Sequence, residues 1–403
     1  MFLCNVYQFN ELLGPLDELL REEEERREKA AHRGSLGGKF KNFSKSIFKR
    51  DSSKSSDSLN RELEFVLSDF DNIRVLGIGR FGSVKLVKHK LTKLGYAMKI
   101  SHKQLIVDLH NEKAVCDEKE ILSHLEHPFI AAMYTTFQTA KSLYMLLEML
   151  PGGELWSLLY DTSQNLVSFG APTIHGGLEI VDAQFYFCNV FSAIAHLHDN
   201  NIIYRDLKPE NLVMDRTGYL KLVDFGSAKR LNMGETTNTI CGTPEYIAPE
   251  MILARGHNKG VDYWTLGIFL YELITRRTPF ASTDAAGVYV KIVNPEETLM
   301  HSFETVGGNS FDPTAKDLIL KLLVSNPGMR IGMRSEESDE VWAHPFLENF
   351  TSTDLKMKVY EAPVRPDIDN VFDKTPEDIE QEKIEKQEEI QPFTGRSDTF
   401  SSF

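Results

Sequence analysis

Hydrophobic positions change their spacing along the chain and divide it into regions of different predicted structure. From Phe70 to about residue 101, short runs such as IRVLGIGR, SVKLVKHK and YAMKIS are rich in β-branched residues and lack a helical period, which indicates β-strands. After Pro151 the apolar runs lengthen, as in DAQFYFCNVFSAIAHLHD and VDYWTLGIFLYELIT, and these indicate helices. The pattern therefore predicts a β-rich part followed by a helical part.

The segments on either side of this region are polar. Near the start, LDELLREEEERREKA (Leu16–Ala30) carries Glu–Arg pairs at i,i+4 and predicts an exposed helix. Arg33–Arg50 then hold six basic residues, no acidic ones and three phenylalanines, and SSKSSDS predicts a flexible linker. From about residue 348 the chain is rich in Asp and Glu. We interpret these segments as an N-terminal extension and a C-terminal tail.

Composition narrows the class of protein. A chain of 403 residues that is 41% apolar can bury a large core, and a formal net charge of −14 argues against nucleic acid as the main partner. Four widely spaced cysteines fit a reducing compartment and match neither a disulfide framework nor a zinc site. No apolar run approaches the ~20 residues of a membrane span. The start, MFLCNVYQF, lacks a basic signal-peptide region, and Phe2 excludes N-myristoylation. We expect a cytoplasmic or nuclear location.

The stretch LGIGRFGSV carries Gly77, Gly79 and Gly82 in the G-x-G-x-x-G spacing. Three structures share that spacing: a dinucleotide-binding loop that opens a helix, a lid over ATP that joins two antiparallel strands, and a plain hairpin turn. The following run, SVKLVKH, has valines but no helical period. A strand after the loop favours the lid over the dinucleotide-binding loop.

Lys99 lies inside the strand-like run YAMKI, where burial would be costly without a partner. A phosphate together with a carboxylate would resolve that cost, and Glu118 in the helical run CDEKEILSHL is the candidate carboxylate. The alternative is an edge-strand lysine and a solvated helix glutamate.

The stretch YRDLKPEN (Tyr204–Asn211) carries the residue types that phosphoryl transfer requires, since that reaction needs an aligned nucleophile, neutralised phosphate charge and a held Mg²⁺. Asp206 can accept the proton of a hydroxyl, and Lys208 can stabilise charge on the transferred group. Asn211, together with Asp224 of the following LVDFG, offers the hard oxygen ligands that Mg²⁺ prefers. Together and in this order, the glycine stretch, the strand lysine, YRDLKPEN and DFG are far more specific than any one of them.

With APE at Ala248–Glu250, the chain from about Phe70 to Phe346 resembles a eukaryotic protein kinase. The resemblance implies an α+β fold with a small antiparallel β-rich N-lobe, a larger helical C-lobe, ATP in the cleft between them, two Mg²⁺ ions and Mn²⁺ as an alternative ion. We place the boundaries at 1–65 for the extension, 66–150 for the N-lobe, 151–347 for the C-lobe and 348–403 for the tail.

The same resemblance assigns further roles. Asp262 would brace the catalytic loop, and Glu250 would pair with Arg330. The residues implied at the nucleotide are the lid residues Gly77, Gly79, Phe81 and Gly82, the adenine-slot residues Leu76, Val84, Ala97 and Val213, the gatekeeper Leu147, the backbone of Glu148 and Leu150, and Lys99.

The runs YMLLEMLPGGELWSLL, GYLKLVDFGSAKR, CGTPEYIAPE and GHNKGVDYWTLG narrow the resemblance to the AGC group, and within it to cyclic-nucleotide-dependent kinases. ELWSLL and FDKTPED resemble the cyclic-GMP-dependent type. The terminal F-x-x-F, Phe400–Phe403, is similar to the end of the cyclic-AMP-dependent catalytic subunit. We expect it to dock on the N-lobe, with Phe372 at the edge of the adenine pocket.

The family resemblance also implies the substrate. Glu154, Glu210 and Glu272 match positions that bind arginines before the phosphorylated residue, and sheltered carboxylates bind guanidinium groups strongly. An apolar pocket for the residue after the phosphoacceptor would be formed by Ile240, Pro244 and Ile247. We expect basic protein or peptide substrates of the form Arg-Arg-x-Ser/Thr-hydrophobic. Solvated surface glutamates are the alternative.

Regulation is implied at Thr239, which matches the activation-loop phosphosite and whose phosphate would pair with Arg205 and Lys229. An upstream kinase would be the modifying partner. The sequence departs from the family at Ala114, where a histidine usually contacts this phosphate, and at an insert over residues 162–177. The role of the insert is open, and the alternative is a surface loop that the fold tolerates. The usual phosphoserine before Phe400 is absent, and the acidic tail would substitute for it.

The segment before the lid is too short for a cyclic-nucleotide-binding domain, so we expect a separate regulatory subunit or a further N-terminal portion to bind any cyclic nucleotide. HRGSL (His32–Leu36) resembles a substrate and is either a pseudosubstrate or autophosphorylation segment or a basic linker. Residues 33–50 could also contact anionic membrane weakly.

Three rival functions remain open on the sequence. A pseudokinase scaffold is disfavoured because Lys99, Asp206, Asn211 and Asp224 are all intact. A small-molecule kinase is disfavoured because CGTPEY and APE build a peptide-binding platform. An AGC kinase without cyclic-nucleotide control is the third. The sequence favours an active Ser/Thr protein kinase that uses Mg·ATP.

Overall fold

The protein is known from a computed structural model that describes residues 65–160, 176–306, 311–333, 338–368, 372–373, 390–396 and 398–403. The chain divides into two units at Leu67, and every described helix and strand belongs to the unit that begins there. Several sequence predictions lie outside the described residues: the helix Leu16–Ala30, the basic stretch Arg33–Arg50, HRGSL, the linker SSKSSDS, residues 162–175 of the insert and residues 374–389 of the acidic tail.

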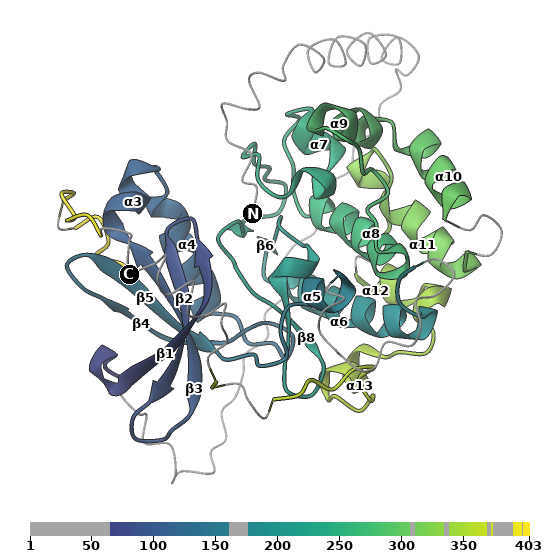
Figure 1. The fold of residues 1–403 in the computed structure, drawn as a ribbon. Helices are drawn as coiled ribbons and strands as arrows, with labels where there is room; N and C mark the ends of the chain where they lie inside the picture. The colour runs from purple at the N-terminus through teal and green to yellow at the C-terminus, as the bar shows by residue number, and fades with distance from the viewer. Residues whose placement is uncertain are drawn as a thin grey trace, which may run out of the picture. The chain divides into compact units, whose positions relative to one another are not determined.

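The β-rich lobe is a five-stranded antiparallel sheet of strand order β1-β2-β3-β5-β4 (Figure 1). Its strands are β1 (Phe70–Gly79), β2 (Gly82–His89), β3 (Gly95–His102), β4 (Met133–Gln138) and β5 (Ser142–Glu148). β1 and β2 form a hairpin whose last pair is Gly79 with Gly82. The glycine stretch therefore joins two antiparallel strands and does not open a helix, which excludes the dinucleotide-binding loop.

Two helices accompany this sheet, α3 (Lys103–Asp108) and α4 (Glu112–Ser123). α4 buries Val115, Glu118, Ile121 and Leu122. Three of these are apolar and pack in the core, whereas Glu118 is a carboxylate that requires a cationic partner at that depth.

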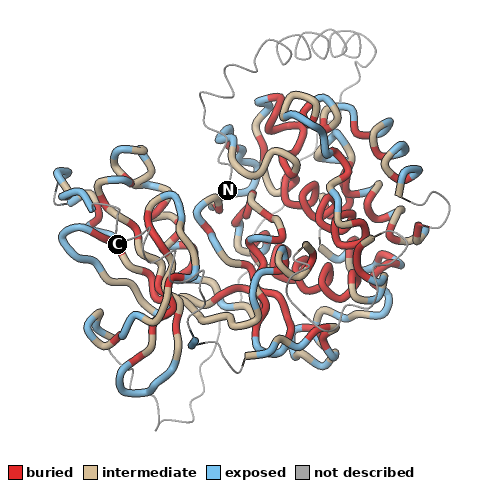
Figure 2. Tube along the Cα trace, viewed as in Figure 1, coloured by how far each residue is buried: buried red, intermediate tan, exposed pale blue. Residues whose placement is uncertain are grey.

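The helical lobe is built around α6 (Ile180–Asp199) and α8 (Gly260–Thr275). Every residue of α8 is buried, and α6 is buried along nearly its whole length (Figure 2). The other helices are α5 (Leu155–Tyr160), α7 (Pro249–Ile252), α9 (Ala285–Val293), α10 (Pro295–Thr305), α11 (Pro313–Leu322), α12 (Ser338–Trp342) and α13 (Ser352–Lys356). The α+β, two-lobed fold expected from the sequence is confirmed.

Among the described helices, α6 is long and apolar enough to cross a membrane. In the sequence itself we found no apolar run of that length. In its most apolar window, 78% of the helix is buried inside the domain. That burial is what the central helix of a packed core shows, and length and composition alone are weak support for a membrane span.

Two short strand pairs fix the segments that carry the predicted catalytic residues. β6 (Ile202–Ile203) pairs with β9 (Lys229–Arg230), and β7 (Leu212–Met214) pairs with β8 (Leu220–Leu222). The loop between β6 and β7 and the loop between β8 and β9 are thereby held side by side, since each is fixed at both ends by a ladder.

The tail returns to the β-rich lobe. Phe400 is 2% exposed and shares a cluster with Ile106, Val115, Leu143 and Met145. Thr136 donates to the carbonyl oxygen of Phe403 at 2.9 Å. The terminal aromatic residues thus lie on the N-lobe, where the sequence led us to expect them.

Candidate active site

The segment after β6 is fixed by one buried carboxylate. Asp262, fully buried at the start of α8, accepts hydrogen bonds from the backbone N–H groups of Tyr204 (2.9 Å) and Arg205 (2.8 Å). It also lies 2.8 Å from His198 Nε2. Arg205 adopts a left-handed φ of 69°, a conformation that a residue with a side chain keeps only where its surroundings impose it. Asp262 therefore fixes the backbone at Tyr204 and Arg205 and, with it, the direction in which the following residue, Asp206, points.

That next residue, Asp206, is held by two side chains. Lys208 Nζ lies 3.2 and 3.1 Å from the two Asp206 carboxylate oxygens and 3.2 Å from Thr243 Oγ1. Asn211 Nδ2 donates to the Asp206 carbonyl at 2.8 Å and to its carboxylate at 3.0 Å. Burial raises the pKa of Asp206, and the contacts with Lys208 and Asn211 oppose that shift. The site thus holds an oriented acceptor beside a cation.

A second cluster joins the sheet, α4 and the segment after β8. Lys99 Nζ, on β3, lies 2.6 Å from Glu118 Oε1 and 3.1 Å from Asp224 Oδ1. Burial alone would lower the pKa of Lys99, but Asp224 and Glu118 outweigh it and hold that pKa above its usual value. Lys99 in turn lowers the pKa of Asp224. Burial raises the pKa of Glu118, and Lys99 opposes that shift. Lys99, on an inner strand, is therefore a protonated amine between two acidic side chains, and the edge-strand alternative does not apply.

The oxygen donors of the site suit Mg²⁺. Asp224 is kept ionised by Lys99, and its left-handed φ of 54° fixes the direction of its side chain. Asn211 supplies an amide oxygen from the neighbouring loop. Among the described residues there is no group of three or more His, Cys, Asp or Glu that could enclose a metal ion. A donor set of one carboxylate and one amide leaves coordination positions for water and phosphate oxygens, as Mg²⁺ prefers.

The glycine-rich turn leads into β2, whose Val84 pairs with Lys99. Gly82 has a φ of +153°, and a Cβ there would come within 2.3 Å of the Ile100 carbonyl oxygen, so only glycine fits. At Gly77 a Cβ would meet no atom within 4 Å, so this part of the turn borders open space. The predicted adenine-slot side chains are not buried: Leu76 is 39% exposed, and Val84, Ala97 and Val213 are half-buried, as is the predicted gatekeeper Leu147.

Strand register places several of these residues on one face of the sheet. Ala97 pairs with Leu147, and Val84 pairs with Lys99, so each pair projects to the same side. Phe372 lies against the turn before β3, where its ring is 3.0 Å from the position of a Cβ on Gly95 and 4.6 Å from Lys88 Nζ. Gly95, which the Phe372 ring approaches, is two residues before Ala97 of the predicted adenine slot.

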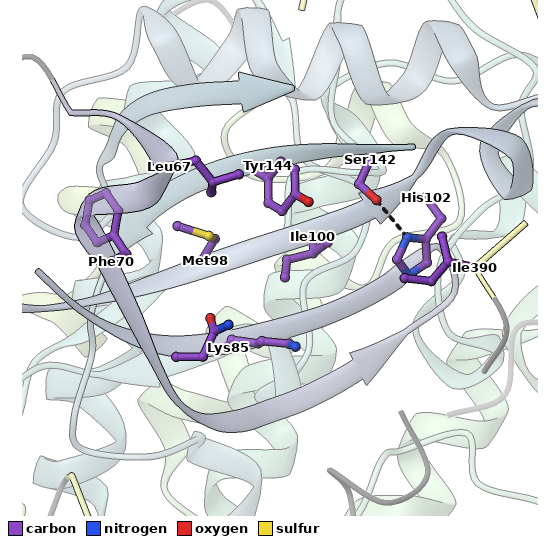
Figure 3. A pocket seen from close by; sticks show the side chains of 10 residues that line it. Leu67, Phe70, Lys85, Met98, Ile100, His102, Ser142, Tyr144 and Ile390 are labelled. Atoms are coloured by element: carbon purple, nitrogen blue, oxygen red, sulfur yellow. Dashed lines mark hydrogen bonds between the residues drawn. The ribbon is translucent and has the colours of Figure 1, made fainter. Parts of the chain in front are cut away.

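A hollow of about 270 Å³ lies on the opposite face of the sheet (Figure 3). Met98 and Ile100 line it, whereas Ala97 and Lys99 alternate with them and point to the other side. Ile390 of the tail covers one edge. The hollow is therefore separate from the catalytic groups.

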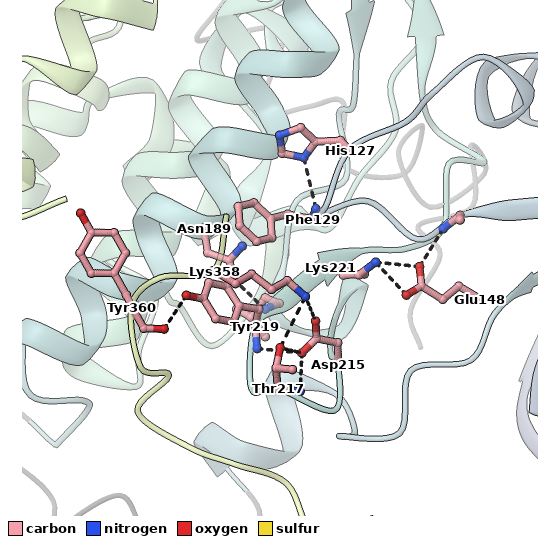
Figure 4. A network of polar contacts seen from close by, with 12 residues as sticks. His127, Phe129, Glu148, Asn189, Asp215, Thr217, Tyr219, Lys221, Lys358 and Tyr360 are labelled. Carbon is pink, nitrogen blue, oxygen red and sulfur yellow. Dashed lines mark hydrogen bonds and ion pairs between the residues drawn. The ribbon is translucent and has the colours of Figure 1, made fainter. Parts of the chain in front are cut away.

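Polar contacts tie the end of β5 to the helical lobe (Figure 4). Lys221, on β8, lies 2.7 and 2.8 Å from the two carboxylate oxygens of Glu148, and Glu148 also accepts from the Ala132 backbone N–H at 3.1 Å. Lys358 of the tail pairs with Asp215 near β8. The Glu148 side chain, for which the sequence predicted only a backbone role, thus links the lobes.

The three predicted substrate carboxylates differ in environment. Glu154 and Glu210 are exposed, and partial burial together with the charge of Glu210 raises the pKa of Glu154. Glu272 is 5% exposed, and its two oxygens accept hydrogen bonds from the hydroxyls of Tyr160 and Tyr246. Burial raises the pKa of Glu272 to about 7. Glu272 is thus not the solvated surface glutamate of the alternative interpretation.

We expect Glu272 to make folding stability fall with rising pH. Its carboxyl binds a proton more tightly in the folded chain (pKa about 7) than in the unfolded chain (4.5). The stability it contributes is therefore complete below pH 4.5 and is lost as pH rises through 7. Between pH 5 and 8 the wild type should lose roughly 2 kcal/mol relative to Glu272→Gln in urea unfolding. Exposed Glu120→Gln is the control, and parallel pH curves for wild type and Glu272→Gln would refute the assignment.

The activation loop (residues 231–243) carries the predicted phosphosite. Thr239 is exposed, whereas Thr237 is buried and accepts a hydrogen bond from Lys229 Nζ at 2.7 Å. Arg205 Nε donates to the Ser227 carbonyl at 2.7 Å. The structure thus brings Lys229 to Thr237 and leaves the Thr239 hydroxyl at the surface.

Of the predicted apolar substrate pocket, Ile247 is buried and Ile240 is 40% exposed. Pro244 begins a short 3-10 helix between them, Pro244–Tyr246. The side chains that sequence reasoning missed are Tyr160, Tyr246 and Lys221. Each makes its contact across a long stretch of sequence, and no local pattern marks such a partner.

Comparison with known proteins gives the family. Residues 70–347 match the model of the protein kinase domain. The chain is 41% identical to cGMP-dependent protein kinase 2 of Rattus norvegicus over 309 residues, which is 76% of this chain and 38% of that protein. It is 36% identical to cAMP-dependent protein kinase type 3 of Saccharomyces cerevisiae over 321 residues, which is 78% of this chain and 75% of that protein.

The chain thus spans well under half the length of the cGMP-dependent relatives and most of the length of the yeast protein. The matched region contains both lobes, the glycine-rich turn and the two clusters around Asp206 and Lys99. The chain belongs to the protein kinase family.

Proposed function

We propose that the chain is a protein serine/threonine kinase of the cyclic-nucleotide-dependent type, which transfers the γ-phosphate of ATP to Ser or Thr in basic substrates. The observation that carries the proposal is the pair of clusters in which Lys99 contacts both Glu118 and Asp224, while Lys208 and Asn211 hold Asp206. These are the groups that phosphoryl transfer needs: Lys99 comes from β3, Glu118 from α4, and the others from the segments after β6 and β8.

Each group takes a distinct role. Asp206 would accept the hydrogen bond of the substrate hydroxyl and orient it, and Lys208, 3.1 Å away, would stabilise charge on the transferred group. Lys99 would contact the nucleotide phosphates while Glu118 holds it in place. Asn211 and Asp224 would hold Mg²⁺, and the family resemblance implies two such ions. When bound, Mg²⁺ would neutralise phosphate charge.

The nucleotide would lie against the face of the sheet that carries Val84, Ala97 and Leu147, beneath the glycine-rich turn. Gly77 borders open space there, and the partly exposed side chains provide apolar contact for a base. The pairing of Glu148 with Lys221 supports a fixed hinge, with the backbone of Glu148 and Leu150 as the hydrogen-bonding edge.

The partners follow from charge and from the relatives. Exposed Glu154 and Glu210 suit arginine-containing substrates, and Thr239 suits an upstream kinase. Relatives named as cGMP- and cAMP-dependent kinases support control by a cyclic nucleotide, bound by a regulatory subunit or by a further portion of the protein. We place the activity in the cytoplasm or nucleus.

The test is phosphate transfer from Mg·ATP to an Arg-Arg-x-Ser-Leu peptide by the purified chain, with and without added regulatory subunit. Turnover that requires Mg²⁺ and disappears with an Ala-for-Ser peptide is expected. Repeating the assay with Mn²⁺ tests the alternative ion. Absence of turnover with Thr239 phosphorylated would favour the pseudokinase scaffold.

We expect Glu210→Gln to weaken recognition of arginine two positions before the acceptor. A carboxylate–guanidinium hydrogen bond contributes more than a neutral one, so kcat/KM for the Arg-Arg peptide should fall by roughly tenfold to a hundredfold. A peptide with Ala at that position should be unaffected. Glu120→Gln, which alters an exposed carboxylate on α4 that is not one of the predicted substrate positions, is the matched control. An unchanged Arg-to-Ala preference would remove Glu210 from the substrate site.

A further inference from the structure

Within the part of the chain that the structure describes, two buried nitrogen atoms near the activation loop have no hydrogen-bond partner. They are Nη1 of Arg205, a residue 8% exposed, and Nε2 of His257, a residue 3% exposed. An unpaired polar group at such depth is costly, and native structures contain few of them. The charge of Arg205 acts on His257, so the two side chains are near enough for one group that supplies acceptors to serve both.

Strand register places His257 on the same side as Lys229. His257 and Thr237 exchange two backbone hydrogen bonds of 2.9 Å, and residues paired in this way project their side chains from one face. Thr237 accepts from Lys229 Nζ on that face at 2.7 Å. The imidazole of His257 therefore lies on the side of the loop that Lys229 reaches.

The surroundings of His257 are cationic and tightly packed. Burial lowers the pKa of His257 to about 4, and the charges of Arg205 and Lys229 act in the same direction, while Glu250 and Asp262 oppose them. At the preceding Gly256, a Cβ would lie 3.1 and 3.2 Å from side-chain oxygens of Thr236 and Asn238. The backbone just before His257 is therefore packed closely against the loop.

We propose that His257 is a third contact of a phosphate carried by Thr239, donating a hydrogen bond from Nε2 beside Arg205 and Lys229. This inference rests on the proposed function, which makes Thr239 the phosphorylated residue. A phosphate group has three acceptor oxygens, which could serve Arg205 Nη1, His257 Nε2 and a further proton of Lys229 Nζ, whose described contact is with Thr237. Thr239 follows Thr237 by two positions and is exposed to a modifying enzyme.

The inference changes which part of the domain the phosphate would stabilise. Ala114, on α4, offers only a methyl group, whereas His257 belongs to the segment that leads into α8. The phosphate would therefore fasten the activation loop to the helical lobe. The contact between Lys99 and Glu118 is already formed without it.

The test measures the phosphate itself. The full chain phosphorylated at Thr239 is prepared as wild type, His257→Phe and His257→Gln, and the phosphothreonine is titrated by phosphorus NMR. Free phosphothreonine titrates near pH 6, and cationic donors lower that value. We expect His257→Phe to raise the midpoint and to increase the rate of phosphatase cleavage about tenfold. His257→Gln, which keeps a donor near the Nε2 position, should restore part of both.

Two controls separate this contact from simple packing. Exposed His301→Phe should change neither readout. Introducing His257→Phe into Thr239→Ala should lower the melting temperature less than it does in the phosphorylated chain. An unchanged titration and cleavage rate in His257→Phe would overturn the inference while leaving the phosphosite intact.

Failure of wild-type Thr239 to accept phosphate from any activating kinase would instead contradict the proposed phosphosite. In that case inorganic phosphate is titrated into Thr239→Ala. Binding that is lost in His257→Phe would show that the donors serve a free anion, and this too would overturn the assignment to Thr239.

Discussion

Replacing Asp206 by Asn should lower kcat by about a hundredfold to ten-thousandfold, the range that a positioned proton acceptor typically contributes. The substitution keeps the size of the side chain and its contact with Asn211, but it removes the negative charge that Lys208 contacts at 3.1 and 3.2 Å. The affinity for ATP should change little, because the Lys99 cluster is separate. Steady-state peptide phosphorylation and nucleotide binding, measured on the same preparation, give the two quantities.

Asp71→Asn is the matched control, since Asp71 is exposed and pairs with Lys90 at 3.7 Å on the far end of the sheet. It should leave kcat unchanged. Equal turnover by Asp206→Asn and wild type would show that the oriented carboxylate has no part in the reaction.

Replacing Arg330 by Ala should lower the free energy of unfolding of the helical lobe by about 3–5 kcal/mol, because it leaves Glu250 buried without its partner. Arg330 is fully buried and contacts both Glu250 oxygens at 2.7 Å. It also donates to the Gly260 carbonyl at 2.7 Å and stacks on Trp264 at 5.1 Å. Denaturant unfolding followed by tryptophan fluorescence measures the loss.

An exposed pair provides the comparison. Arg365 and Glu361 lie 3.3 Å apart with both side chains largely in water, so Arg365→Ala should cost well under ~1 kcal/mol. The double variant Arg330→Met, Glu250→Leu should be more stable than Arg330→Ala, since it removes the unpaired charge. A loss as small for Arg330→Ala as for Arg365→Ala would show that the buried pair does not stabilise the lobe.

The sequence predicted the elements whose signal is local. The strands β1 to β3 and the helices α6 and α8 follow from the spacing of apolar residues, and the glycine-rich turn was correctly placed between strands because the run after Gly82 lacks a helical period. The candidate catalytic residues came from motif spacing, and their roles remain predictions. The structure adds that Asp206 and Lys99 belong to two adjoining clusters.

Contacts between distant segments could not be predicted from the sequence. Tyr160 and Glu272 are 112 positions apart, and neither residue type signals that the carboxylate would be buried under two hydroxyls. Lys221 and Glu148, 73 positions apart, meet only because the lobes pack together. Burial of a charged residue depends on which surface covers it, and that is a property of the tertiary fold.

The return of the tail to the β-rich lobe has a consequence for synthesis on the ribosome. Thr136 and Phe403, whose contact helps to close the core around Phe400, are 267 positions apart. At ordinary translation speed, this distance corresponds to roughly 10 to 50 seconds. During that interval the apolar side chains that pack against Phe400 stay uncovered, and a chaperone has access to them. Translation rate along the helical lobe should therefore influence the yield of folded protein.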